Sequence, residues 1–206
     1  MENFDLVQGP ALFIANHASF MDGSAVMAAL PRRYKSKVAW PAAADRFFIK
    51  GRKELRKQGW WFSLMFNSYP MKRGGGSAAL EYTDWLIKKG WSIVIFPEGA
   101  RTSSAKLARF RMGPAILATR HNLPVVPMHL EGLGAIRPKG SREMTPGPVT
   151  VRVGRPITFA PGTDPKVANK LLYDTINNMH LEAAEVRRAA RARAESQARV
   201  PEPVGV

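Results

Sequence analysis

The sequence predicts an α/β layered sandwich, in which helices flank a mostly parallel central sheet. Short apolar segments recur along the chain, helix-type segments separate them, and 206 residues suffice for one domain with a sizeable core. Strands that alternate with helices favour a parallel sheet, because each helix carries the chain back to the edge where the next strand begins.

The strands are predicted from apolar segments. They are expected at residues 11–15, 37–43, 91–96 and 124–130, with a half-buried strand at 149–153 where valines alternate with polar residues. The segment WSIVIF at 91–96 is apolar and contains β-branched residues, which is typical of a central strand.

Helices are predicted at residues 22–30, 77–89, 114–121 and 166–195. Pro31 ends the first helix, Ser77 is a candidate N-cap of the second, and Gly90 lies beyond its end. The chain from residue 181 onward is rich in Ala, Arg and Glu. We therefore expect one domain over residues 1–180 and a basic tail over 181–206 that is helical or disordered.

The charge balance predicts an anionic partner. The chain has 31 Lys and Arg against 16 Asp and Glu, a formal net charge of +15, which suits nucleic acid, an anionic membrane surface or a phosphorylated substrate. No recognisable nucleic-acid motif is present, so no nucleic acid is expected as a partner. The absence of cysteine excludes cysteine nucleophiles and thiolate metal sites. No segment approaches the roughly 20 apolar residues of a transmembrane helix, so any membrane contact is expected to be peripheral.

A histidine and an aspartate stand directly after the first predicted strand, in the segment NHASFMD at 16–22. A turn there can bring the Asp22 carboxylate onto the His17 imidazole, where it fixes the tautomer and stabilises the imidazolium. Such a base turns a hydroxyl into a nucleophile near neutral pH. An isolated His–Asp pair in a loop is more often structural, so the pair alone leaves both interpretations open.

A second motif, FPEGART at 96–102, follows the strand predicted at 91–96. Ligands gather at the carboxyl edge of open α/β sheets. Gly99 allows a tight turn, Arg101 offers a planar fork suited to phosphate, and Glu98 could bind a hydroxyl or position Arg101. The alternative is a strand-exit turn with a surface ion pair.

Together the two motifs resemble those of the PlsC-like glycerolipid acyltransferases, which include the 1-acylglycerol-3-phosphate acyltransferases. Three further segments fit the same family in the same order: YPMKRG at 69–74, FRMG at 110–113 and LPVVP at 123–127. The resemblance covers roughly residues 10–160. Ala100 replaces the usual Thr and Thr102 the usual Ser, and neither change removes a charge.

The resemblance implies direct acyl transfer without a covalent acyl-enzyme, in an acyltransferase domain over residues 1–180. His17 acts as the base on the acceptor hydroxyl, and Asp22 supports it. The acceptor oxygen then attacks the thioester of acyl-CoA or acyl-carrier protein, which is a donor substrate. No cofactor and no metal are expected.

The resemblance also assigns the acceptor, lysophosphatidic acid (1-acyl-glycerol-3-phosphate), and its phosphate site. Arg73 and Arg101 hold the phosphate, while Glu98 and Gly99 shape that pocket. The enzyme is expected to act peripherally at the cytoplasmic face of a membrane, on an anionic surface.

Several alternatives stay open. The acceptor could be glycerol-3-phosphate, another lysophospholipid or a lyso-aminolipid. From another class, the chain could be a basic, non-catalytic module that binds lipid or nucleic acid. Apolar and aromatic residues at 60–66 follow basic residues at 52–57, which indicates either an interfacial segment or a core helix with a solvated basic face.

Overall fold

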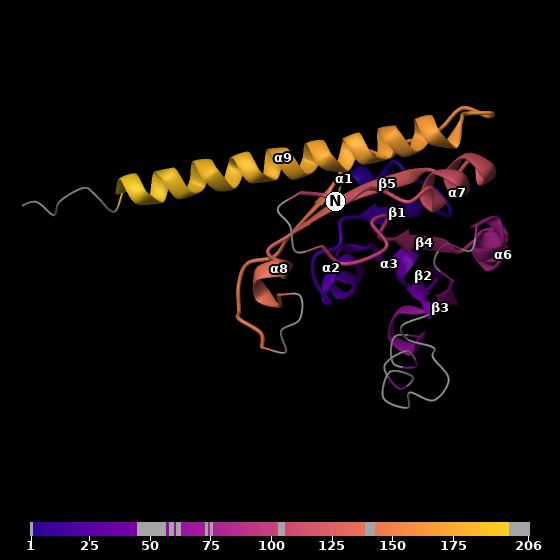
Figure 1. Ribbon diagram of the computed structural model, residues 1–206, viewed down its shortest axis with the longest axis horizontal. Coiled ribbons are helices and arrows are strands. Elements are labelled where there is room, and N and C mark those ends of the chain that lie inside the picture. The colour runs from indigo at the N-terminus through magenta and orange to yellow at the C-terminus, as the bar shows by residue number, and fades with distance from the viewer. Residues whose placement is uncertain are drawn as a thin grey trace, which may run out of the picture.

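The computed structural model describes residues 2–44, 57, 60, 63–72, 74, 76–102, 106–138 and 143–197. Its centre is a six-stranded sheet in the order β3-β2-β4-β1-β5-β6 (Figure 1). The strands are β1 (Leu12–Ala15), β2 (Val38–Ala43), β3 (Ser68–Met71), β4 (Ser92–Ile95), β5 (Val125–Glu131) and β6 (Thr150–Val153). The helices are α1 (Glu2–Asp5), α2 (Asp22–Ala29), α3 (Arg32–Lys35), the 3-10 helix η1 (Gly76–Leu80), α6 (Glu81–Lys88), α7 (Gly113–His121), α8 (Leu133–Ile136) and α9 (Pro165–Gln197).

The sheet is parallel except at one edge. β1 lies between β4 and β5, with Phe13 aligned to Val94 on one side and to Val126 on the other. The pairs β2–β3 and β2–β4 are also parallel, and only β6 runs antiparallel, against β5. The predicted α/β fold class with a mostly parallel sheet is confirmed.

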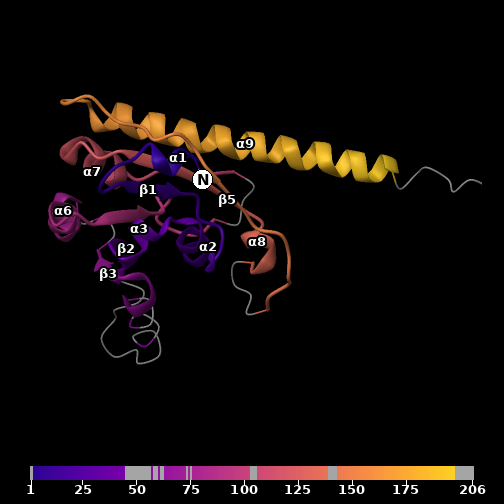
Figure 2. The ribbon, with the colours of Figure 1, turned by 180° about the vertical axis from the view of Figure 1, so that it is seen from behind.

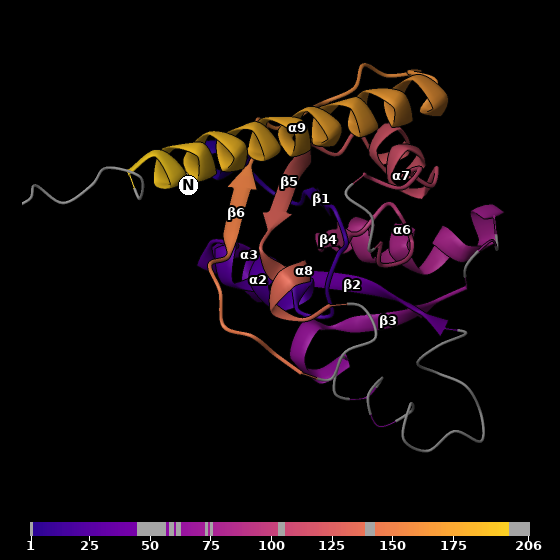
Figure 3. The same ribbon diagram turned by 60° about the vertical axis from the view of Figure 1, so that its left-hand side comes forward.

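Helices cover both faces of the sheet, because successive strand residues point to opposite sides. Leu12 and Ile93 face one core, which contains residues of α6, α7 and α9. Phe13 and Val94 face the other, with residues of α1, α2, α3 and α8. The helix α9 contacts both β5 and α7, and Figure 3 shows it beside these two elements. The resulting three layers bury the central strands completely.

Besides the short helices α1, α3 and α8, which the sequence did not predict, two details differ from the sequence-based expectations. The helix expected from Ser77 begins as the 3-10 helix η1 and becomes the α-helix α6 only at Glu81. The sheet also gains β3, whose Pro70 argues against a strand in the sequence. Pro70 is tolerated because β3 is the edge strand of the described sheet.

The last helix, α9, runs unbroken through residue 181, where the sequence predicted the start of a basic tail. Beyond that point Ala183 is buried, and Arg187 forms an ion pair with Glu131 of β5. The final turns of α9 extend past the sheet in both Figure 1 and Figure 2. The structure therefore has the helical alternative for residues 181–197, and the division into domain and tail stays a prediction.

None of the helices within the described residues combines the length and apolarity that crossing a bilayer requires.

Candidate active site

The side chain of Asn16 continues the pairing of β1 with β5 and fixes the exit of β1. Its Nδ2 donates to the Leu130 carbonyl at 3.0 Å, and its Oδ1 accepts the Leu130 N–H at 2.7 Å. Asn16 is buried, so these bonds satisfy an amide whose burial would otherwise be costly. His17 therefore leaves the sheet from a fixed position.

Asp22 begins α2 and contacts His17. Its Oδ2 lies 2.8 Å from the His17 Nδ1 and accepts the N–H groups of Ala18 and Ser19 at 2.7 and 2.9 Å. The Asp22 side chain is 0% exposed and that of His17 is 22% exposed. A carboxylate only accepts hydrogen bonds, so Nδ1 carries the hydrogen and Nε2 is left to take a proton. The structure brings the two predicted residues together, and their catalytic role stays a prediction.

Glu98 joins the two sequence motifs. Its Oε1 accepts the His17 N–H at 2.7 Å, and its Oε2 accepts the Ala108 N–H at 3.1 Å. The Thr102 N–H donates to the His17 carbonyl at 2.9 Å. Burial raises the pKa of the Glu98 carboxyl, while the two backbone hydrogen bonds lower it in part. The predicted role of Glu98 in the phosphate pocket stays a prediction, since the contacts in the structure are to backbone.

The imidazole of His17 stacks on Phe96, the residue that follows β4. Their ring centroids are 4.3 Å apart, and the ring planes differ by 14°. Phe96 in turn lies against Trp40 of β2, at 6.0 Å between centroids. The stack covers one face of the imidazole and restricts its rotation, so three strands contribute to the position of His17.

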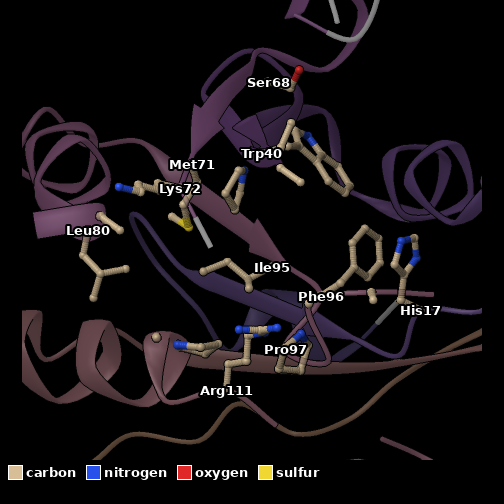
Figure 4. A pocket seen from close by; sticks show the side chains of 18 of the residues that line it. His17, Trp40, Ser68, Met71, Lys72, Leu80, Ile95, Phe96, Pro97 and Arg111 are labelled. Carbon is tan, nitrogen blue, oxygen red and sulfur yellow. The ribbon is translucent and has the colours of Figure 1, made fainter. Parts of the chain in front are cut away.

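A cavity of about 620 Å³ opens beside His17 at the carboxyl edge of β1, β2 and β4 (Figure 4). One part of its wall is apolar, formed by Trp40, Met71, Leu80, Ile95 and Ile116. The basic side chains of Lys72, Arg101 and Arg111 also line the cavity. A cavity lined by both apolar and basic side chains suits a ligand that has a hydrocarbon chain and an anionic group.

Three of the predicted site residues line the cavity, namely His17, Gly99 and Arg101. Asp22 and Glu98 are buried, and both contact His17. Asp22 contacts the imidazole, and Glu98 accepts the main-chain N–H. Arg73 lies outside the described residues, as does most of the basic segment at 52–57.

Sequence reasoning missed Lys72 and Arg111. Both stand in segments that carry the family resemblance, but no role followed from the pattern. The signals that could have indicated them are the place of Lys72 two residues before Gly74 and the place of Arg111 two residues before the start of α7. Within the described residues, no group of three His, Cys, Asp or Glu side chains lies close enough together to hold a metal ion.

The other histidines lie away from the cavity wall and contact neighbouring side chains. His121 contacts Asp84 at 2.6 Å, and the His129 Nε2 lies 3.1 Å from the His180 Nδ1. Ser19 donates its hydroxyl to the Arg137 carbonyl at 3.2 Å, in keeping with a turn hydroxyl. Only His17 among the described histidines lines the cavity.

Comparisons with known proteins identify the family of the chain. A family model described as Acyltransferase matches residues 1–131. The chain is 29% identical over 155 residues to a 1-acyl-sn-glycerol-3-phosphate acyltransferase of Cocos nucifera, covering 71% of this chain and 46% of that protein. It is 32% identical over 161 residues to a chloroplastic 1-acyl-sn-glycerol-3-phosphate acyltransferase of Brassica napus, covering 76% and 43%. The chain thus spans less than half the length of these two relatives.

A solved structure has the same fold. The crystal structure of the 1-acyl-sn-glycerophosphate acyltransferase PlsC from Thermotoga maritima superposes with a TM-score of 0.67 at 23% identity, covering 85% of this chain and 67% of that one.

Proposed function

Because this chain belongs to the acyltransferase family, we propose that it transfers a fatty acyl group from an acyl thioester to the free hydroxyl of lysophosphatidic acid. The observation that carries the proposal is the 2.8 Å contact between His17 Nδ1 and Asp22 Oδ2 on the wall of a large cavity. The names of the relatives from Cocos nucifera and Brassica napus support lysophosphatidic acid as the acceptor.

In the proposed reaction, the His17 Nε2 takes the proton from the acceptor hydroxyl as its oxygen attacks the thioester carbonyl carbon. Asp22 stabilises the imidazolium and keeps Nδ1 protonated. The C–S bond of the tetrahedral intermediate then breaks, and the leaving sulfur takes the proton from Nε2. The products are the ester and the free thiol, and His17 returns to its starting form without a covalent acyl-enzyme or a cofactor.

The apolar and the basic side chains of the cavity suit the two ends of such substrates. The apolar wall with Trp40, Met71 and Leu80 accommodates an acyl chain, and the cations at Lys72 and Arg101 attract phosphate. We assign Arg101 and Arg73 to the acceptor phosphate on the family resemblance. Acyl-CoA and acyl-carrier protein are both candidate donors.

The enzyme is proposed to act peripherally at the cytoplasmic face of an anionic membrane. Support comes from the net charge of +15 and from the exposed apolar side chains of Leu64 and Met65, which directly precede the cavity residue Phe66 in the chain. Because a lysophospholipid acceptor resides in a membrane, a surface that inserts beside the cavity shortens the path of the substrate.

The test is release of CoA thiol by the purified chain with oleoyl-CoA and lysophosphatidic acid in mixed micelles. Wild-type release that disappears in His17→Ala and persists in His121→Ala supports the proposal, because His121 lies outside the cavity. A panel with glycerol-3-phosphate, other lysophospholipids and a lyso-aminolipid identifies the acceptor. No transfer with any acceptor, from CoA or carrier-protein donors, would exclude the catalytic function and leave a lipid-binding or nucleic-acid-binding module.

A further inference from the structure

Arg111 adds a guanidinium to the cavity wall. It stands two residues before the start of α7, is exposed and lines the cavity wall (Figure 4). Within the described part of the chain its side chain forms no hydrogen bond or ion pair, whereas Arg120 pairs with Asp84 and Arg152 pairs with Glu131. A cation at a cavity wall that lacks a carboxylate partner is available to an anionic ligand.

The position of Arg111 depends on Gly99. Gly99 has a φ of +71°, and a Cβ built there would overlap the Arg111 Nε and lie 2.8 Å from its Cδ. The Arg111 N–H also donates to the Pro97 carbonyl at 2.9 Å. Both the main chain and the side-chain stem of Arg111 are therefore packed on the turn that leads to Arg101, which limits the conformational entropy that binding would cost.

Glu98, the acid in this turn, leaves the guanidinium available. Its two oxygens accept the backbone N–H groups of His17 and Ala108. Arg111, Arg101 and Lys72 all line the cavity. The planar fork of a guanidinium makes paired hydrogen bonds to phosphate oxygens, and such charge-assisted bonds are the strong ones.

We propose that Arg111 binds a phosphate group of a substrate in the cavity, and that a side chain at residue 99, where the φ of +71° already favours glycine, would also displace Arg111. The identity of the substrates rests on the proposed function. The phosphate belongs either to the lysophosphatidic acid acceptor or to the CoA donor, and the experiment separates these sources.

The experiment measures binding without turnover. In a His17→Ala background, titration calorimetry gives the Kd of CoA, of a short-chain lysophosphatidic acid and of the matching uncharged monoacylglycerol. Arg111→Gln is compared with Arg109→Gln, which removes the same charge from an exposed position of the same loop that does not line the cavity. Circular dichroism verifies that each variant is folded.

We expect Arg111→Gln to weaken one phosphate-bearing ligand by about 10- to 100-fold and Arg109→Gln to weaken it by less than about threefold. A loss for lysophosphatidic acid assigns Arg111 to the acceptor, and a loss for CoA assigns it to the donor. Equal effects of the two variants, no effect of Arg111→Gln on either ligand, or an equal loss for monoacylglycerol would overturn the proposal. Failure of the His17→Ala chain to bind either phosphate-bearing ligand would also overturn it.

A second variant tests Gly99. We expect Gly99→Ala to weaken the same ligand as Arg111→Gln, and the double variant to be no weaker than Arg111→Gln alone, because both changes remove one contact. Additive losses would contradict the role given to Gly99. A wild-type chain that binds both ligands but transfers no acyl group would contradict the proposed function while the binding result for Arg111 stands.

Discussion

Glu98 holds the backbone of His17, because its Oε1 accepts the His17 N–H at 2.7 Å while its Oε2 accepts the Ala108 N–H at 3.1 Å. The carboxylate thus ties the histidine loop to the loop that leads to α7. A buried carboxylate whose two oxygens both meet backbone donors is suited to positioning the base. It has little capacity left for a contact with substrate.

We predict that Glu98→Gln lowers kcat about 10- to 100-fold and leaves the KM for lysophosphatidic acid unchanged. The carboxamide has a single acceptor oxygen, so one of the two backbone N–H groups loses its partner. An unsatisfied buried donor costs about 1–3 kcal/mol, and the free energy of unfolding is expected to fall by that amount. Steady-state kinetics and urea denaturation measure the two effects.

The matched control for Glu98 is Glu182→Gln, which alters an exposed carboxylate of α9 and is expected to change neither quantity. If Glu98→Gln instead raised KM with an unchanged kcat, Glu98 would contact the acceptor, as the family resemblance implies.

We predict that Asp22→Asn lowers kcat at least about 100-fold with a small change in KM. The Asp22 Oδ2 faces three hydrogen-bond donors, and an amide in its place can point its own N–H toward the His17 Nδ1. That contact would favour the tautomer with hydrogen on Nε2, which cannot take a proton from the acceptor. Steady-state kinetics measure kcat and KM. The midpoint of thermal unfolding is measured on the same variant, so that a folding defect is recognised. A kcat within about threefold of the wild type would exclude Asp22 as the partner of the base.

Local patterns in the sequence predict much of the fold and the centre of the site. All strands except β3 follow from apolar or alternating segments, and the His17–Asp22 contact follows from a spacing of five residues that a single turn can close. Contacts between distant segments do not follow in this way. Glu98 accepts the His17 N–H because β1 and β4 are neighbours in the sheet. Arg111 packs on Gly99 because the segment before α7 returns to the turn after β4. The length of α9 is also open in the sequence, since Ala, Arg and Glu suit both an exposed helix and a solvated tail.

We predict that Leu64→Ser together with Met65→Ser weakens binding to anionic lipid vesicles about 10-fold or more. These side chains are 67% and 58% exposed. Inserting one large apolar side chain into a bilayer contributes about 1.5–3 kcal/mol. Sedimentation with vesicles that contain phosphatidylserine measures the fraction of protein bound to the vesicles. Val167→Ser on α9 is the control, because it is 63% exposed and lies on a different element. Equal losses in control and test variants would show that the segment near the cavity is not the inserting surface.

We predict that the wild type loses about 3 kcal/mol of stability relative to His129→Gln as the pH falls from 6.5 to 4. Burial, with a smaller effect of the neighbouring His180, lowers the pKa of His129 from 6.5 to about 4. Between these values the unfolded chain binds a proton at His129 and the folded chain does not. The free energy of unfolding therefore falls as the pH falls through this range. Above pH 6.5 His129 is largely neutral in both the folded and the unfolded chain, so it causes no loss of stability there. Urea denaturation of both proteins across this range measures the free energies of unfolding. Their difference cancels the effect of the other titrating groups.

The variant His180→Gln removes the contact at 3.1 Å and separates the effect of His180 on the pKa of His129 from the effect of burial. A difference between wild type and His129→Gln that stays constant from pH 6.5 to 4 would mean that His129 is protonated equally in the folded and unfolded chains.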